Sequence, residues 1–400
     1  MPASAGASES GLPPTAGPGL YLHIPFCSAI CPYCDFAVLT GGRKSKAGYV
    51  ASLLSEAGMV AGAAASEWPA FDTIYLGGGT PSALAPDELG RLLETMRTAL
   101  PTSAQMRVFL EANPEDVTPE SLRSWRELGV TTLSLGIQSF DGGSLRFLGR
   151  RHGPEDAQRC VELAREAGFH TVSIDLIYGL PEDTLASFRR TLEEAVELRP
   201  DHLSCYQLTI HEGTPFGFRA ARGKLAELPE PEQAELFLFT HSFLDDHGYP
   251  GYEVSSFARS RDHRSRHNLK YWDHTPYLGL GPSAHSFDGG RRWWNERKLA
   301  PYEARLARGE LPIAGSEELT RQDLALEALM LGLRTYDGID LARFERRHGV
   351  DLLALNGPLV EKLTARRLLE VRGGALVPSL QGLAVADSLA RWFETGGVEP

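Results

Sequence analysis

Three of the five cysteines lie close together, with a spacing that could hold a metal centre. Cys27, Cys31 and Cys34 are separated by three and then two residues, and they directly follow an apolar run that predicts a strand. Thiolates are the usual ligands of iron–sulfur clusters. Three thiolates on one loop can hold three corners of a [4Fe–4S] cubane and leave the fourth iron open to another ligand. We therefore expect a cluster of this kind on these cysteines.

A structural zinc site is the alternative for the same cysteines. Zinc in such a site needs a fourth protein ligand that closes the tetrahedron. His23 could supply it in principle, but it lies inside the predicted strand. The two remaining cysteines are expected in the core, because Cys160 falls on an apolar helical stripe and Cys205 lies in a predicted strand.

Composition and charge narrow the class of protein. The chain has 400 residues and a formal net charge of −12, which disfavours nucleic acid as the main substrate. No apolar stretch is long enough to span a bilayer. Residues 1–18 are rich in Ala, Ser, Gly and Pro and resemble no signal peptide, so we expect a disordered leader and a cytoplasmic protein. An odd, clustered set of cysteines favours metal binding over disulfides.

Short apolar runs alternate with helical patterns from about residue 20 to 255. The alternation predicts βα units around a parallel sheet, in the form of an α/β, partial (β/α)6-type barrel. A full barrel of eight units is the structural alternative. Barrel enzymes carry their chemistry where the strands end. The expected strands are Tyr21–Ile24, Thr73–Leu76, Arg107–Glu111, Thr132–Ile137, Thr171–Ile177 and His202–Leu208, with Tyr252–Val254 as a shorter candidate.

Helical patterns lie between and after these runs. They cover residues 47–64, 86–99, 119–128, 154–167, 184–198 and 231–247. Residues 256–319 form an extension rich in His, Arg and aromatic residues, which separates the barrel, 19–255, from a C-terminal domain, 320–396. That domain is expected to contain helices at 320–334, 340–348 and 354–365, a hairpin turned by Gly373-Gly374, and a last helix at 381–394. The order resembles a winged helix, but its charges are nearly balanced, which favours a scaffold over DNA binding.

The stretch from Tyr21 to Cys34, YLHIPFCSAICPYC, resembles the opening of the HemN/HemW group of the radical S-adenosylmethionine (SAM) superfamily. Similar motifs run from about residue 20 to 290, and a similar C-terminal domain follows. The resemblance implies that the open iron binds the amino and carboxylate groups of SAM. It also implies a SAM pocket at the ends of the strands. The implied SAM-binding residues are Tyr21, Tyr33, Gly78, Gly79, Thr80, Glu111, Gln138, Arg150 and Asp175.

Two features favour the HemW branch, whose members are regarded as haem chaperones. The HemN type carries a further cysteine two residues after the third, where this chain has Phe36. The stretch His267-Asn-Leu-Lys-Tyr-Trp272 resembles the HNxxYW motif of HemW. A histidine can bind haem iron, and aromatic residues can face a porphyrin. We therefore expect His267, Tyr271 and Trp272 to bind haem, with His263, His274 and His285 as fallback ligands.

Five cations near this motif are candidates for the haem propionates: Arg259, Arg261, Arg264, Arg266 and Lys270. The alternative is a structural histidine in a well-satisfied loop with solvated arginines.

Two functions compete. The favoured one is a haem chaperone that passes haem to an acceptor protein, implied by the resemblance to be respiratory, and that carries a [4Fe–4S] cluster with exchangeable SAM. The other is an oxygen-independent coproporphyrinogen III oxidase, a radical SAM oxidoreductase. Phe36 and the motif at His267 favour the carrier over the enzyme. A homodimer agrees with the sequence, although no feature of it requires one.

Overall fold

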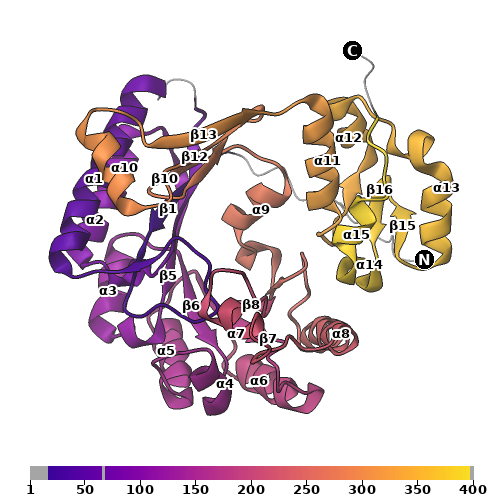
Figure 1. Ribbon diagram of the computed structural model, residues 1–400, viewed down its shortest axis with the longest axis horizontal. Coiled ribbons are helices and arrows are strands. Elements are labelled where there is room, and N and C mark those ends of the chain that lie inside the picture. Colours follow the sequence, from indigo (N-terminus) through magenta and orange to yellow (C-terminus); the bar gives the residue numbers. More distant parts are fainter. Residues whose placement is uncertain (1–16, 65–67, 397–400) are drawn as a thin grey trace, which may run out of the picture.

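The structure is a computed structural model that describes residues 17–64 and 68–396. The first sixteen residues of the expected leader, 1–18, lie outside the described residues. Within the described part, one large sheet with helices on its outer face carries most of the chain, and a smaller unit follows it (Figure 1).

Seven neighbouring strands of the large sheet run parallel to one another, in the order β10-β1-β4-β5-β6-β7-β8. Six of them match the predicted runs in place and direction. Apolar side chains of these strands that face the helices are wholly buried, as in Leu20, Leu22 and Ile24 of β1. The six are β1 (Gly19–Ile24), β4 (Phe71–Gly78), β5 (Thr102–Ala112), β6 (Thr132–Gln138), β7 (Thr171–Tyr178) and β8 (His202–Gln207).

Helices between these strands cover the outer face of the sheet (Figure 1). The predicted N-cap Thr118 accepts a hydrogen bond from Ser121 N, and Pro119 opens the helix as expected. The helices of this layer are α1 (Arg43–Ala64), α2 (Pro86–Ala99), α3 (Pro119–Glu127), α4 (Gly142–Phe147), α5 (Pro154–Glu166), α6 (Leu185–Glu197) and α8 (Glu230–Asp246). Cys160 and Cys205 lie in the core, as predicted, with 2% exposure each.

The sheet is open, and residues after 255 extend it on both edges. At one edge β10 (Tyr277–Leu280) pairs with β1, and β11 (His285–Phe287), β12 (Arg291–Asn295) and β13 (Ile313–Glu318) continue antiparallel. At the other edge β9 (Ser256–Ala258) pairs antiparallel with β8. The predicted partial barrel is confirmed, and the eight-unit alternative does not form among the described residues.

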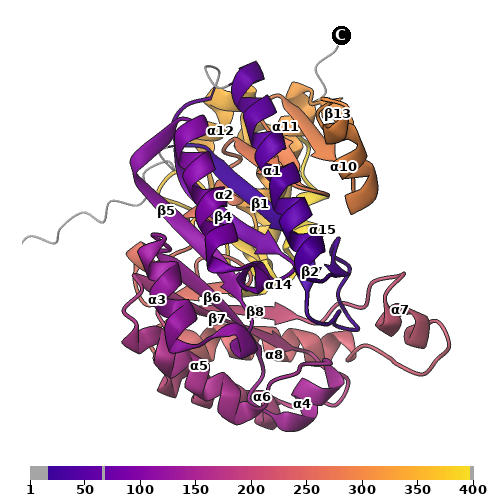
Figure 2. The ribbon, with the colours of Figure 1, turned by 90° about the vertical axis from the view of Figure 1, so that its left-hand side faces the viewer.

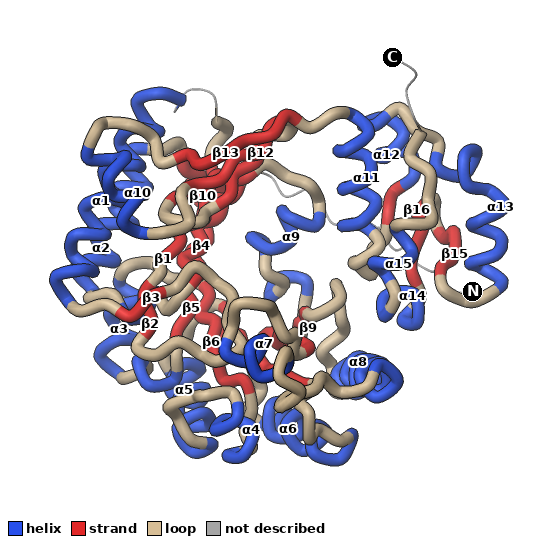
Figure 3. The backbone as a smooth tube through the Cα atoms, in the orientation of Figure 1, coloured by secondary structure: helices blue, strands red, loops and turns tan. Residues whose placement is uncertain are grey.

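The predicted strand Tyr252–Val254 is wrong, because the strand lies four residues later, in β9. Tyr252 and Glu253 instead sit in a bend whose Glu253 bridges to Thr335. Helix α9 (Arg266–Trp272), which the sequence patterns did not predict, lies inside the curve of the sheet, against β4 (Figure 3).

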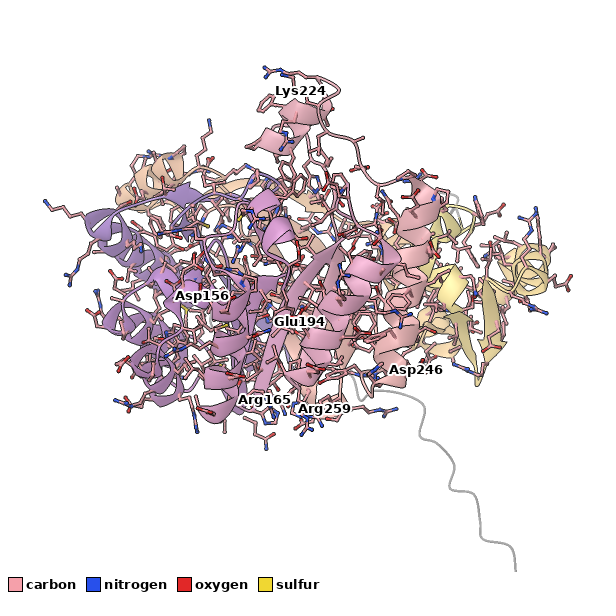
Figure 4. All side chains as sticks on the ribbon, turned by 90° about the horizontal axis from the view of Figure 1, so that it is seen from below. Asp156, Arg165, Glu194, Lys224, Asp246 and Arg259 are labelled. Atoms are coloured by element: carbon pink, nitrogen blue, oxygen red, sulfur yellow. The ribbon has the colours of Figure 1, made fainter. Side chains whose placement is uncertain are left out.

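Two short segments stand at the end of the barrel where the parallel strands finish. The strands β2 (Phe26–Cys27) and β3 (Leu39–Thr40) pair in parallel and bracket the loop that carries the cysteines. Helix α7 (Pro215–Ala220) projects on the same side as β2 (Figure 2). Lys224, just after this helix, lies at the outer tip of the projecting segment (Figure 4).

The C-terminal part has its own hydrophobic core, which includes Leu329, Leu363 and Leu376. The predicted last helix, 381–394, is wrong, because the chain is broken at Val385, with φ of −124° and ψ of 21°, into two short helices that end at Ala390. The hairpin was predicted, whereas β14, which completes its sheet, was not. The elements are α11 (Arg321–Gly332), β14 (Ile339–Asp340), α12 (Leu341–His348), α13 (Leu352–Ala365), β15 (Leu369–Arg372), β16 (Ala375–Pro378), α14 (Leu380–Ala384) and α15 (Ala386–Ala390).

The remaining helix of the extension, α10 (Leu299–Ala307), packs against α1. In the part of the chain that the structure describes, no helix combines the length and apolar character needed to cross a membrane.

Candidate functional site

The three clustered cysteines face one cavity at the strand ends. Cys27, Cys31 and Cys34 are free, half-buried, and line a cavity of about 500 Å³. The loop that carries them turns tightly, and the backbone N–H of Cys34 donates to the carbonyl of Cys31 at 3.1 Å. The sequence therefore places three soft thiol ligands around one space, as a cluster requires.

A chain of hydrogen bonds connects two of these sulfur atoms. Thr80 Oγ1 donates to Cys27 Sγ at 3.6 Å, and Arg150 Nη1 donates to Cys31 Sγ at 3.5 Å. Asn113 joins the two donors: its Nδ2 donates to Thr80 Oγ1 at 3.1 Å, and its Oδ1 accepts from Arg150 Nη2 at 2.7 Å. Hydrogen bonds to cluster sulfurs are one means by which a protein sets a reduction potential.

The protonation of the cysteines also suits a metal centre. Burial raises the pKa of the Cys27 thiol, and it raises the pKa of Cys34 to about 11. Without a cation the thiols of Cys27 and Cys34 therefore hold their protons, and metal binding must displace them. The Arg150 guanidinium brings the nearest fixed positive charge to the sulfur of Cys31.

The geometry fits a cluster better than a single zinc ion. Both ring nitrogens of His23 are engaged, Nδ1 with Tyr21 Oη at 3.1 Å and Nε2 with the carbonyl of Ala37 at 3.0 Å. His23 is therefore a poor fourth ligand. Among residues 17–64 and 68–396, no three His, Cys, Asp or Glu side chains converge on a point that could hold one ion. A cubane needs no such convergence, since each thiolate binds a different iron.

Eight of the nine predicted SAM-binding residues line the same cavity. Tyr21 is the exception, because its ring stacks on Tyr75 and its hydroxyl group bonds to His23. Arg150 Nε is buried without a hydrogen-bond partner among the described residues, so an acceptor within the cavity would complete its contacts. The eight residues are Tyr33, Gly78, Gly79, Thr80, Glu111, Gln138, Arg150 and Asp175.

The glycines at the end of β4 are required by the protein itself. A Cβ on Gly79 would lie 2.8 Å from the carbonyl oxygens of Ile24 and Phe26. Gly78 adopts φ of +107°, and a Cβ there would lie 2.6 Å from the ring of His23. The turn is therefore pressed against the end of β1, beside the cysteine loop, and glycine is the residue that permits this approach.

Glu111 and Asp175 are both half-buried in the cavity wall. Glu111 accepts from Tyr75 Oη at 2.7 Å and from Gly78 N at 3.3 Å, and burial raises its pKa to about 7. Asp175 accepts from Ser134 Oγ at 3.1 Å, and burial raises its pKa to about 6. These carboxylates are poised to gain from a cationic ligand, which would favour their ionised forms.

Gln138 ends β6 with a left-handed φ of +67°. The register of β6 against β7 shifts between Leu135 and Gln138, so the chain leaves the regular ladder at this point. Strained backbone of this kind is common at functional sites, and here it lies in the cavity wall.

The structure places the predicted haem-binding residues outside the cavity lining, directly behind it. His267 is 1% exposed, and its Nδ1 bonds to Thr73 Oγ1 at 2.9 Å while its Nε2 bonds to Tyr271 Oη at 3.1 Å. Trp272 packs against the small cluster around Tyr252. His267 could bind iron only by breaking one of these bonds, so the geometry weighs against His267 as a haem ligand. That His267 binds haem remains a prediction.

The cations near this motif are partly committed to ion pairs. Lys270 is wholly buried, and its Nζ lies 2.5 Å from Asp72 Oδ1. Arg266 Nη2 lies 2.8 Å from Oδ2 of the same carboxylate. Arg264 packs over the ring of Tyr252, 5.2 Å from its centroid. These three cations therefore have partners within the fold around α9, and their pairing with haem propionates stays a prediction.

The fallback histidines differ in their surroundings. His274 is buried and its Nε2 lies 2.9 Å from Glu327. His285 is exposed and stacks on Trp294, outside the cavity lining. His263 lines the cavity, but its Nδ1 bonds to Thr171 Oγ1 at 3.0 Å.

Sequence reasoning missed Asn113, which lies two residues after Glu111 in a stretch that was noted only for its acid. It also missed α7. Phe216 in this helix is wholly buried, and its backbone N–H donates to the carbonyl of Pro32 in the cysteine loop at 2.9 Å. The pattern Thr214-Pro215, an N-cap followed by proline, was the available signal for this helix.

Comparisons with known proteins agree with this site. A family profile described as Radical SAM superfamily matches residues 21–195, and one described as HemN C-terminal domain matches residues 319–385. The heme chaperone HemW of Bacillus subtilis is 34% identical over 370 residues, which cover 92% of this chain and 97% of the relative. HemW of Mycobacterium tuberculosis H37Rv is 36% identical, covering 95% and 96%.

Among solved structures, coproporphyrinogen III oxidase (HemN) from Escherichia coli superimposes with a TM-score of 0.80. It is 25% identical, and the match covers 94% of this chain and 90% of that one.

Proposed function

The chain belongs to the HemW family of radical SAM proteins, and from this premise we propose that it binds haem and passes it to an acceptor protein. The observation that carries the proposal is the near full-length identity of 34–36% with proteins named heme chaperone HemW. Phe36, in place of a further cysteine, supports the same branch.

We further propose that Cys27, Cys31 and Cys34 hold a [4Fe–4S] cluster and that SAM occupies the adjoining cavity. When bound, the cluster supplies a one-electron centre with an open iron for the methionine end of SAM. The chain's own part is to orient these groups. Arg150 and Thr80 donate to two of the sulfurs, and Glu111 and Asp175 offer buried carboxylates to the cationic parts of SAM.

A second function, oxidation of coproporphyrinogen III, is supported by one observation. The HemN structure superimposes on 94% of this chain. Both functions use the same cluster and SAM cavity, so the geometry of the cavity does not separate them. The substrate does separate them: the carrier binds haem without turnover, whereas the oxidase decarboxylates a tetrapyrrole with the consumption of SAM.

One sample can test both functions. The full chain is reconstituted with iron and sulfide without oxygen, then titrated with haem and assayed for coproporphyrinogen conversion. We expect stoichiometric haem binding, transfer to apo-myoglobin as a surrogate acceptor, and no protoporphyrinogen. The triple variant Cys27→Ser, Cys31→Ser, Cys34→Ser is expected to lose the cluster and to serve as the control. Turnover to protoporphyrinogen, or absence of haem binding, would overturn the proposal.

A further inference from the structure

Histidine is a common ligand of haem iron, and three histidines line the cavity: His202, His211 and His263. His202 is 4% exposed, with Nδ1 bonded to Ser173 and Nε2 bonded to Tyr252, each at 2.8 Å. His263 is held by Thr171. Only His211 of the three has a ring that is nearly half exposed, at 47%. It is therefore the cavity histidine that an incoming ligand can reach without disturbing the fold.

The surroundings of His211 fit an iron ligand. Its Nδ1 lies 3.8 Å from Asp35 Oδ2, and no described residue forms a hydrogen bond to its Nε2. Histidines that bind metals almost always present the other ring nitrogen to a carboxylate, carbonyl or water, which fixes the tautomer and raises the basicity of the binding nitrogen. At 3.8 Å the Asp35 carboxylate lies near Nδ1 without a direct hydrogen bond, and Nε2 is the nitrogen left for iron.

Two exposed apolar side chains line the same cavity beside this pair. Ile30 is 48% exposed and Phe36 is 65% exposed, and both belong to the cysteine loop that also carries Asp35. Apolar side chains in solvent at a cavity mouth mark a binding surface. A porphyrin face is flat, large and apolar, so it would remove both side chains from water.

A cation stands next to the same loop. Arg297 is exposed and its Nη2 donates to the backbone carbonyl of Asp35 at 2.7 Å. Haem carries two propionates on one edge of its ring. A guanidinium fixed to the loop that offers Phe36 is suited to pair with one of them.

We propose that haem binds at the mouth of the cavity, with its iron held by Nε2 of His211 and its ring over Ile30 and Phe36. Asp35 positions the imidazole, and Arg297 meets a propionate. The proposal rests on the proposed haem-binding function and differs from the motif at His267. It also predicts that haem covers the opening of the SAM cavity, because Ile30 and Phe36 line the same cavity as the SAM-binding residues.

The test uses the full chain with its cluster reconstituted, titrated with ferric haem. His211→Ala is expected to weaken haem binding at least tenfold and to change the Soret band, and added imidazole is expected to restore the spectrum. The matched control is His247→Ala, an exposed histidine outside the cavity lining, which should bind haem like the unmodified protein. Iron content and circular dichroism confirm that each variant is loaded and folded.

The possible outcomes separate the site from the function. If the unmodified chain binds haem and His211→Ala binds it with the same affinity and spectrum, the site is wrong while the function stands. If His267→Ala alone removes the spectrum, the ligand is the buried histidine and the site is again wrong. If the unmodified chain binds no haem, the proposed function fails. As a second readout, bound haem should slow dissociation of labelled SAM, and an unchanged rate contradicts the placement at the cavity mouth.

Discussion

Asn113 shows how a neutral residue can act on a metal centre without touching it. Its amide group holds Thr80 and Arg150, and these two side chains donate to Cys27 and Cys31. A donor stabilises the more negative, reduced state of a cluster. Asn113 is therefore a positioning residue, and its removal should be visible in the cluster rather than in the fold.

We expect Asn113→Ala to make the midpoint potential of the cluster more negative, by on the order of 40 mV. This value corresponds to about 1 kcal/mol. It is the expected weakening of the hydrogen bonds from Thr80 and Arg150 to the cysteine sulfurs once Asn113 no longer holds these donors. The measurement is a redox titration followed by electron paramagnetic resonance, without SAM. Ser82→Ala is the matched control, since Ser82 accepts from Asn113 N but contacts no described cysteine sulfur. Equal potentials in both variants would show that the hydrogen-bond chain has no effect on the cluster.

The residues that the sequence could predict are those with a strong chemical signature. Three closely spaced cysteines, a glycine turn after a strand, and acids inside apolar strands all lie around one cavity. Asn113 and His211 carry no such signature, because an amide and an exposed histidine are common in loops. Their roles depend on which strands and loops meet, and this is a property of the fold. His267 illustrates the reverse case, since its motif is specific while its ring is buried and hydrogen-bonded.

At the scale of elements, α7 acts as a support for the cysteine loop. Phe216 is wholly buried and packs against Tyr33 and Phe147, with ring centroids 6.4 and 4.8 Å apart. Its backbone N–H also donates to Pro32 in the loop. The loop has few regular hydrogen bonds of its own, so this contact fixes its position.

We expect Phe216→Ala to loosen the cluster while the rest of the fold remains intact. The loss of a buried phenylalanine costs about 3 kcal/mol or more, and here the cavity opens in a small hydrophobic cluster apart from the main core. Release of iron to a chelator should become at least severalfold faster. Phe218→Ala, on the same helix but 57% exposed, is the control and should release iron at the normal rate. If both variants behave alike, α7 does not support the loop.

The elements that could be predicted are those with a regular pattern of burial. Parallel strands covered on both faces appear as continuous apolar runs, and the six predicted runs form β1 and β4 to β8. The strands β10 to β13 contain Gly279, Arg292 and the pair Trp293-Trp294, which form no continuous apolar run. Of these, β10 is a strand because it pairs with β1 across more than 250 residues, and β11, β12 and β13 each pair with the strand before them. A local pattern cannot show this long-range pairing.

Across the whole molecule, buried histidines join parts that are distant in sequence. His202 in β8 bonds to Tyr252, His241 in α8 bonds to Tyr336 near the C-terminal unit, and His267 in α9 bonds to Thr73 in β4. Burial lowers the pKa of His202 and His267 to about 3 and that of His241 to about 4. The native protein therefore holds all three rings neutral at neutral pH.

This arrangement predicts a loss of stability as the pH falls. The unfolded chain binds protons on these histidines below a pKa of about 6.5, whereas the native chain does not until far lower pH. The contribution of these histidines to the free energy of unfolding is complete above about pH 7.5. Between pH 8 and pH 6 each histidine lowers that free energy by about 0.8 kcal/mol. These three residues should together make the free energy of unfolding about 2.5 kcal/mol lower at pH 6 than at pH 8. The measurement is urea unfolding of the cluster-loaded protein without oxygen. The variant His202→Gln should reduce that difference by about a third. The control His247→Gln, at an exposed position, should leave the difference unchanged. Equal pH dependence in both variants would mean that the fold does not hold His202 neutral.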